Sequence, residues 1–168
     1  YFDPQQKYSL CFNVGTTALI YNKQLVSETP ESWKVLWDEQ YKDKILMFNN
    51  SRDAFAIAQA LLGQSFNTTS EADWNQAAEL LARQKDAVSP VYVMDEIFNL
   101  MESGEYAFAT YYAGDYALMN ENNEDLAYCF PEEGVNIFYD AFCIPKCVQN
   151  KRGAEAFINF MHEPQVAL

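Results

Sequence analysis

The sequence is poor in positive charge. Among its 168 residues, lysine and arginine together number 11 and aspartate and glutamate 24, which gives a formal net charge of −13. A surface of that sign repels phosphate backbones and anionic lipid headgroups, so we expect no nucleic-acid partner. The same surface is compatible with a cationic ligand, although an excess of acidic residues by itself indicates only that the protein is soluble.

Catalytic and cofactor motifs are also scarce. His162 is the only histidine, which argues against a catalytic triad and favours a cap at the end of a helix. No glycine-rich phosphate loop is present. The four cysteines are too few for a disulfide scaffold, and the spacing of Cys143 and Cys147 lacks the partners of a metal site, so buried thiols are expected. We therefore expect no cofactor, no metal and no enzymatic activity.

Long hydrophobic runs are missing as well. No apolar run reaches the ~18 residues of a membrane span, and no signal-like N-terminus is visible. The first residue is Tyr1, so we expect a preceding segment to have been removed and any membrane anchor to lie in a segment absent here. With 49% hydrophobic and 21% charged residues, the chain has the composition of a globular protein of about one domain.

Strand-like and helix-like patterns alternate along the chain. Two strands are predicted within residues 8–22, pivoting near Gly15, and others at 45–48, 91–93, 106–112, 126–130 and 135–144. Helices are predicted at 32–40, 53–62, 95–102 and 151–163, from Ser70 onward, and after Ala113-Gly-Asp115. This alternation predicts an α/β domain with a mixed central sheet and helices on both faces.

Acids and aromatic residues share three loops at predicted strand ends, where α/β sheets bind ligands. These are Asn50-Ser-Arg-Asp53, Tyr111-Tyr-Ala-Gly-Asp115 and Phe138-Tyr-Asp140. Asp140 lies in an otherwise apolar strand, which indicates a partner for its charge or a cleft. Asp53 opens a helix, where a carboxylate commonly caps the backbone, and Asp115 is expected to cap the helix that it begins.

Side chains alternate along a strand, so at least one of Tyr111 and Tyr112 is expected in the core. Dispersed acids with aromatic walls suit a polyamine, because carboxylates hold its ammonium ends and aromatic faces cover its methylenes. Composition alone leaves any other aromatic-lined cleft open.

Several segments resemble bacterial extracytoplasmic solute-binding proteins for spermidine and putrescine. The resemblance rests first on Ser32-Trp-Lys-Val-Leu-Trp-Asp38 followed by Tyr41-Lys-Asp-Lys-Ile45. It continues, in the order of the family, through Gly15–Thr17, Ala113-Gly-Asp115, Pro131-Glu-Glu-Gly134, Asp140, Ile144-Pro145, Asn150-Lys151 and Phe160. Each motif is weak alone, whereas the ordered set covers nearly the whole chain.

The resemblance implies one lobe of a two-lobed receptor of the periplasmic-binding-protein type (type II), which clamps a polyamine and delivers it to an ABC permease. Residues 1–10 would form the hinge strand and its approach, residues 11–140 the second lobe, and residues 141–168 the return strand and helix toward a largely absent first lobe. The implied location is extracytoplasmic, in the periplasm or as a cell-surface lipoprotein.

Site residues also follow from the resemblance, position by position. Asp53 matches the acid that holds one ammonium, and Asp140 the acid that holds an inner amine. Tyr112 and Phe138 occupy tryptophan positions along the alkyl chain of the ligand. Three further residues are candidates for ligand contacts: Ser51, Tyr111 and Tyr139.

Two positions depart from the family pattern. Ala56 replaces a second acid of the spermidine binder, and Val14 replaces a tryptophan. These changes imply an altered ligand preference: the protein would favour a shorter diamine or bind polyamines more weakly. An alternative function keeps the same fold but changes the ligand to another organic cation or an amino sugar. A protein-interaction module would instead show a long exposed apolar patch.

Overall fold

The computed structural model describes residues 3–167 and divides the chain into two compact units. The sheet unit spans Thr16–Asn136, and the terminal unit combines the chain up to Gly15 with the chain from Ile137 onward. Residues 1, 2 and 168 of the expected hinge and return segments lie outside the described residues. The predicted domain limits at residues 10–11 and 140–141 concern a larger two-lobed protein and stay predictions.

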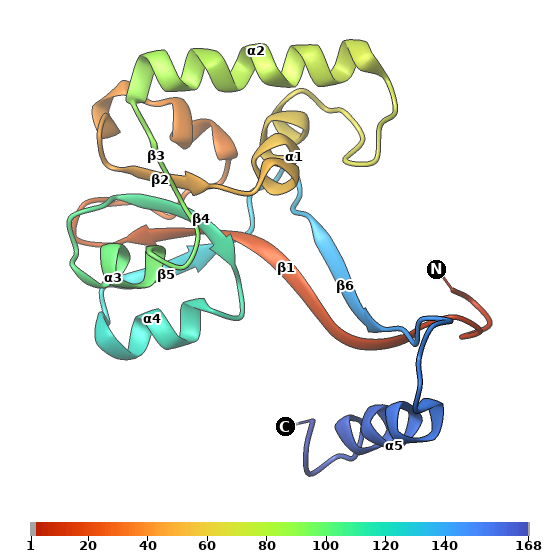
Figure 1. Cartoon of the computed structure of the whole chain (residues 1–168). Coiled ribbons are helices and arrows are strands. Elements are labelled where there is room, and N and C mark those ends of the chain that lie inside the picture. Colours follow the sequence, from red (N-terminus) through yellow and green to blue (C-terminus); the bar gives the residue numbers. More distant parts are fainter. Residues whose placement is uncertain (1–2, 168) are drawn as a thin grey trace. The chain divides into compact units, whose positions relative to one another are not determined.

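The sheet unit is built on a mixed sheet, as predicted (Figure 1). Its strands follow the order β3-β2-β4-β1-β5, where β2 is parallel to β3 and β4, and β1 is antiparallel to β4 and β5. The bounds are β1 (Leu10–Asn22), β2 (Ile45–Phe48), β3 (Val91–Val93), β4 (Phe108–Tyr112) and β5 (Leu126–Cys129).

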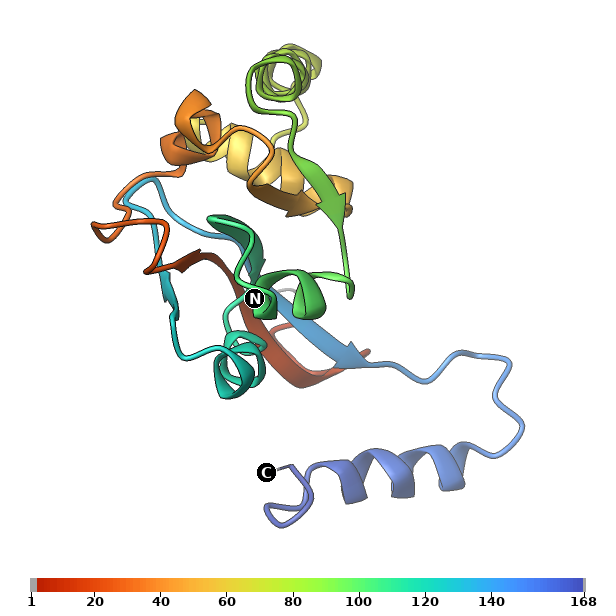
Figure 2. The same ribbon diagram turned by 90° about the vertical axis from the view of Figure 1, so that its left-hand side faces the viewer.

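Helices cover both faces of this sheet (Figures 1 and 2). The helices α1 and α2 lie on one face, and α3 and α4 lie on the other. Their bounds are α1 (Ser51–Leu61), α2 (Glu71–Val88), α3 (Ile97–Glu102) and α4 (Tyr116–Asn122). The two longer helices begin as the sequence favours, because the side chains of Asn50 and Ser70 accept backbone N–H groups of the first turn.

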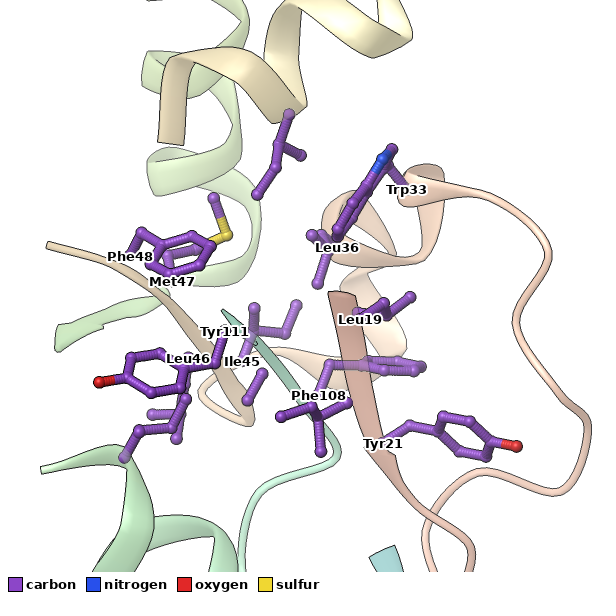
Figure 3. Close-up of a cluster of buried hydrophobic side chains, with 14 of the residues drawn as sticks. Leu19, Tyr21, Trp33, Leu36, Ile45, Leu46, Met47, Phe48, Phe108 and Tyr111 are labelled. Carbon is purple, nitrogen blue, oxygen red and sulfur yellow. The ribbon is translucent and has the colours of Figure 1, made fainter. Parts of the chain in front are cut away.

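The hydrophobic core lies between these layers (Figure 3). All four residues of β2 are buried, as expected for a short apolar strand covered on both faces. Figure 3 shows Phe48 and Met47 of β2 on one side of the core, with Trp33 and Leu36 on the other. The ring of Phe108 in β4 meets that of Tyr41 edge to face at 4.7 Å.

Two local predictions were wrong. Residues 10–22 form one continuous strand rather than two strands that pivot near Gly15. The segment predicted as a helix over 32–40 forms two short 3₁₀ helices, η1 (Trp33–Trp37) and η2 (Glu39–Tyr41). They separate at Asp38, whose backbone is extended and whose side chain accepts the N–H of Gln40 to start the second turn.

The terminal unit contains β6 (Ile137–Phe142), which pairs with β1, and α5 (Lys151–Met161). An aromatic contact connects the two strands, because the rings of Phe12 and Phe142 lie 4.6 Å apart. The expectation of buried cysteines was wrong here, since Cys11, Cys143 and Cys147 are exposed and Cys129 of the sheet unit is half-buried. Within residues 3–167, no helix is long and apolar enough to cross a membrane.

His162 caps the C-terminus of α5, as predicted. Its Nδ1 lies 2.8 Å from the carbonyl oxygen of Ile158, and its Nε2 lies 2.8 Å from that of Cys11 on β1. Carbonyl oxygens only accept hydrogen bonds, so both ring nitrogens must donate, and only the charged imidazolium carries both protons. These two backbone hydrogen bonds raise the pKa of His162 above its ordinary value of 6.5.

The attachment of α5 to β1 is therefore expected to depend on pH. Because the folded pKa is raised, the stabilisation by His162 is fully present below the unfolded pKa and is lost as pH rises through the folded pKa. An NMR titration of the histidine ring should give a pKa above 6.5 in the native protein and an ordinary value in urea. Equal values in the two states would contradict the assignment of an imidazolium.

Candidate functional site

The site forms where two parallel strands end. β2 and β4 are parallel neighbours, so their carboxyl ends lie at the same edge of the sheet. The chain leaves β2 through Asn49 and Asn50 and enters α1, which places Asp53 in the first turn of that helix. Tyr112 is the last residue of β4. The predicted residues Asp53 and Tyr112 therefore meet at this edge.

Side chains from three parts of the sheet unit hold the carboxylate of Asp53. Its Oδ2 accepts hydrogen bonds from Asn50 Nδ2 at 2.9 Å and from the Tyr112 hydroxyl at 3.2 Å. Its Oδ1 accepts a hydrogen bond from Asn136 Nδ2 at 3.0 Å. Asp53 is only 5% exposed. The carboxylate is thus fixed in one orientation by the N-cap residue of α1, the last residue of β4 and the segment before β6.

All of these donors are neutral. Among residues 3–167, no lysine or arginine forms an ion pair with Asp53, and the neighbouring Arg52 instead donates to Asn67. A buried carboxylate without a cationic partner is costly unless hydrogen bonds or a bound cation compensate its charge. The arrangement therefore suits the binding of a cation.

Asp53 does not cap its helix. Asn50 occupies the N-cap position and accepts the N–H of Arg52, while Asp53 sits three residues further along. At that position the carboxylate still lies near the positive end of the helix dipole. Its oxygens are turned to side-chain donors rather than to the backbone.

Tyr112 belongs to an aromatic cluster beside Asp53. Its ring lies 5.3 Å from that of Phe48 and 4.9 Å from that of Tyr111. Burial, and then the charge of Asp53, raise the pKa of Tyr112. The phenol consequently stays protonated at neutral pH and remains a hydrogen-bond donor to the carboxylate.

Tyr111 is the core member of the tyrosine pair, as predicted, because it is buried in the hydrophobic cluster. Its hydroxyl donates to Asp95 Oδ1 at 3.1 Å, and burial raises its pKa. Asp115 does not act as expected: it precedes α4 but makes no capping hydrogen bond. Burial and the nearby charge of Asp95 raise the pKa of Asp115.

The other predicted residues are more exposed. Ser51 is exposed at the first position of α1. On β6 of the terminal unit, Phe138 is half-buried, whereas Tyr139 and Asp140 are exposed. Asp140 lies in the strand in which it was expected, at an exposed position. Within the described part of the chain, no group donates a hydrogen bond to the Asp140 carboxylate or pairs with it, so its oxygens are accessible.

Sequence reasoning missed Asn50 and Asn136 as site residues. Asn50 lies in one of the three candidate loops, where only Asp53 was given a role, and Asn136 lies in no motif. The position of Asn136 is set by Thr17, because the Thr17 N–H donates to the Asn136 carbonyl at 3.0 Å and the Asn136 N–H donates to Thr17 Oγ1 at 3.1 Å. Only the pairing of segments more than 80 residues apart in sequence brings Asn136 to Asp53.

Two of the motifs behind the family resemblance bind each other. The Ser32 hydroxyl and the Trp33 N–H both donate to the carboxylate of Glu133. The indole Nε1 of Trp33 donates to the Gly134 carbonyl at 2.9 Å. These contacts fix the loop that leads to Asn136. The motifs therefore have a structural role, next to the carboxylate site rather than in it.

Comparisons with known proteins agree with this architecture. The spermidine/putrescine-binding periplasmic protein of Salmonella typhimurium is 31% identical over 99% of this chain and 48% of its own length. A solved structure of a putative spermidine/putrescine ABC transporter from Listeria monocytogenes is 35% identical, with a TM-score of 0.89 over 99% of this chain and 51% of that one. The solved structure of the substrate-binding protein PotD from Streptococcus pneumoniae is 33% identical, with a TM-score of 0.81 over 99% of this chain and 51% of that one.

The fold is thus that of a lobe of a periplasmic-binding-protein-like structure, as predicted. The match to bacterial extracellular solute-binding proteins extends over residues 1–168, and the chain belongs to that family. The family is one of transport proteins rather than of enzymes. The chain spans about half the length of the curated relatives that it matches.

Proposed function

We propose that this chain is the polyamine-binding lobe of a receptor that captures putrescine or spermidine outside the cytoplasm for an ABC permease. In this role the chain carries no catalytic activity and binds its ligand without changing it. Relatives with 24–31% identity are named as binders of these polyamines. The chain shares their family and covers about half of their length, so the ligand is carried over as a proposal.

The observation that carries the proposal is the buried carboxylate of Asp53. It is 5% exposed and is held by the neutral donors Asn50, Tyr112 and Asn136. An ammonium group is the ligand that such a carboxylate lacks, because it supplies both the opposite charge and hydrogen-bond donors. The ring of Tyr112, beside the carboxylate, supplies an aromatic face for the first methylenes of the ligand.

Asp140 and Phe138 are proposed to serve the rest of the ligand. The two side chains lie two residues apart on β6, so they project from the same face of that strand. A carboxylate and an aromatic ring on one face match an amine and the alkyl segment beside it. Asp140 is accessible, which a contact to an arriving amine requires.

Calorimetric titration of putrescine and spermidine into the full-length protein tests the proposal. We expect saturable binding of at least one of them, and weaker binding by Asp140→Asn, since a hydrogen bond to a charged group contributes about 1.5–3 kcal/mol. That loss corresponds to a reduction in affinity of roughly tenfold or more. Asp86→Asn, which removes an exposed carboxylate on α2, is the matched control and should leave the affinity unchanged.

The other outcomes separate the parts of the proposal. An absence of binding to either polyamine, together with binding of glucosamine or another organic cation, would overturn the choice of ligand. Equal affinities for the unmodified protein and Asp140→Asn would overturn the role of Asp140 and leave the role of Asp53 to be judged by its own variant.

A further inference from the structure

Gly15 and Phe138 make an unusually close approach in the terminal unit. A Cβ atom built on Gly15 would lie 2.7 Å from Cε2 and 2.8 Å from Cε1 of Phe138, and nearer still to Cζ. Carbon atoms of neighbouring groups pack favourably at about 3.5–4.0 Å. The aromatic ring therefore occupies the space that any side chain at position 15 would need.

The backbone at this position does not itself require glycine. The described glycines with positive φ are Gly63, Gly104 and Gly134, whereas Gly15 continues the extended conformation of β1. Other residues adopt that conformation without strain, and glycine in a strand interior weakens the strand. What excludes a side chain at Gly15 is thus the ring of Phe138, and not the path of the chain.

This contact determines where the ring lies. The Cζ end of the Phe138 ring lies against the backbone of β1, and the side chain is half-buried, so part of its surface remains accessible. A residue with a Cβ would push the ring outward by about 1 Å, the difference between the distances above and ordinary contact. Phe138 lies two residues before Asp140 on the same strand face, so such a shift moves the ring relative to that carboxylate.

We infer that Gly15 is a positioning residue for ligand recognition: it admits the ring of Phe138 against β1 and thereby sets the aromatic surface that covers the alkyl chain of the polyamine. The inference rests on the proposed function. Gly15 has no side chain with which to bind a ligand, so it acts entirely through Phe138.

A double-mutant cycle measured by calorimetry with putrescine and spermidine tests this inference in the full-length protein. Gly15→Ala should lower the affinity on the order of tenfold, the range of a lost contact between an ammonium-bearing chain and an aromatic ring. In the Phe138→Ala background the same substitution should change the affinity less than twofold, because no ring remains to be displaced. Gly114→Ala is the matched control, since a Cβ there meets nothing within 4 Å and its φ is also not positive.

Three results would overturn the inference. Gly15→Ala could bind as tightly as the unmodified protein, it could lose the same factor in both backgrounds, or Gly114→Ala could lose as much. Equal loss in both backgrounds would show a general effect on β1 rather than one that acts through the ring.

A readout without ligand distinguishes this inference from the proposed function. A ring that lies against Gly15 should displace the NMR signal of a Gly15 Hα proton through its ring current, and Phe138→Ala should abolish that displacement. If neither polyamine binds the unmodified protein, the proposed function fails. The Hα shift then still decides whether Gly15 positions the ring, and its absence would overturn that part as well.

Discussion

Asp53→Asn is expected to weaken polyamine binding by about 2–5 kcal/mol, the usual loss when one partner of a buried charge pair is removed. The substitution keeps the size of the side chain but removes the charge that an ammonium needs. It also replaces one carboxylate oxygen by an NH₂ group, although Asn50, Tyr112 and Asn136 all present donors to this position. One donor would then face another, so the orientation of the side chain would be lost together with its charge.

Asp73→Asn on α2 is a closely matched control. Asp73 lies three residues after the N-cap Ser70, as Asp53 lies three residues after the N-cap Asn50. The two substitutions therefore remove the same charge from the same position of a helix dipole. Calorimetric titration should find the binding loss in Asp53→Asn alone. A similar loss in both variants would point to net charge or helix stability, and an unchanged affinity of Asp53→Asn would remove Asp53 from the site.

The elements of the fold were largely predictable because their signals are local. The apolar run Ile45–Phe48 and the cap at Ser70 depend on residues that are neighbours in sequence. The errors arose where two local solutions compete. Asn50 and Asp53 can both cap α1, and nothing in the sequence shows that Asn50 does so while Asp53 turns to other side chains.

The candidate site was only partly predictable for a different physical reason. Its first half, Asp53 and Tyr112, was named through the family resemblance, and the two residues meet because the parallel strands β2 and β4 end at the same edge of the sheet. Its other donor, Asn136, reaches Asp53 through the backbone pairing with Thr17, a contact between segments that are far apart in sequence. Whether Asp140 has a partner or faces a cleft could not be read from the sequence, because the surroundings of an apolar strand depend on which other elements cover it, and the described residues leave Asp140 exposed.

Trp33→Ala is expected to lower the free energy of unfolding by about 3–5 kcal/mol, the usual cost of removing a large buried aromatic side chain. Trp33 is only 1% exposed and lies in the core between η1 and the sheet. Its indole also donates to the Gly134 carbonyl, which would lose this partner inside the protein. Since a native domain is stable by about 5–15 kcal/mol, the loss is a large share of the total.

Urea denaturation followed by circular dichroism measures this effect, and two variants separate its causes. Trp74→Ala removes the same side chain from a half-buried site on α2, where the indole donates to the Thr68 carbonyl, and should cost clearly less. Trp33→Phe keeps most of the buried area but loses the bond to Gly134, so its midpoint should fall between those of Trp33→Ala and the unmodified protein. Equal midpoints for Trp33→Ala and Trp74→Ala would contradict the view that the motif around Trp33 stabilises the loop that carries Asn136 to Asp53.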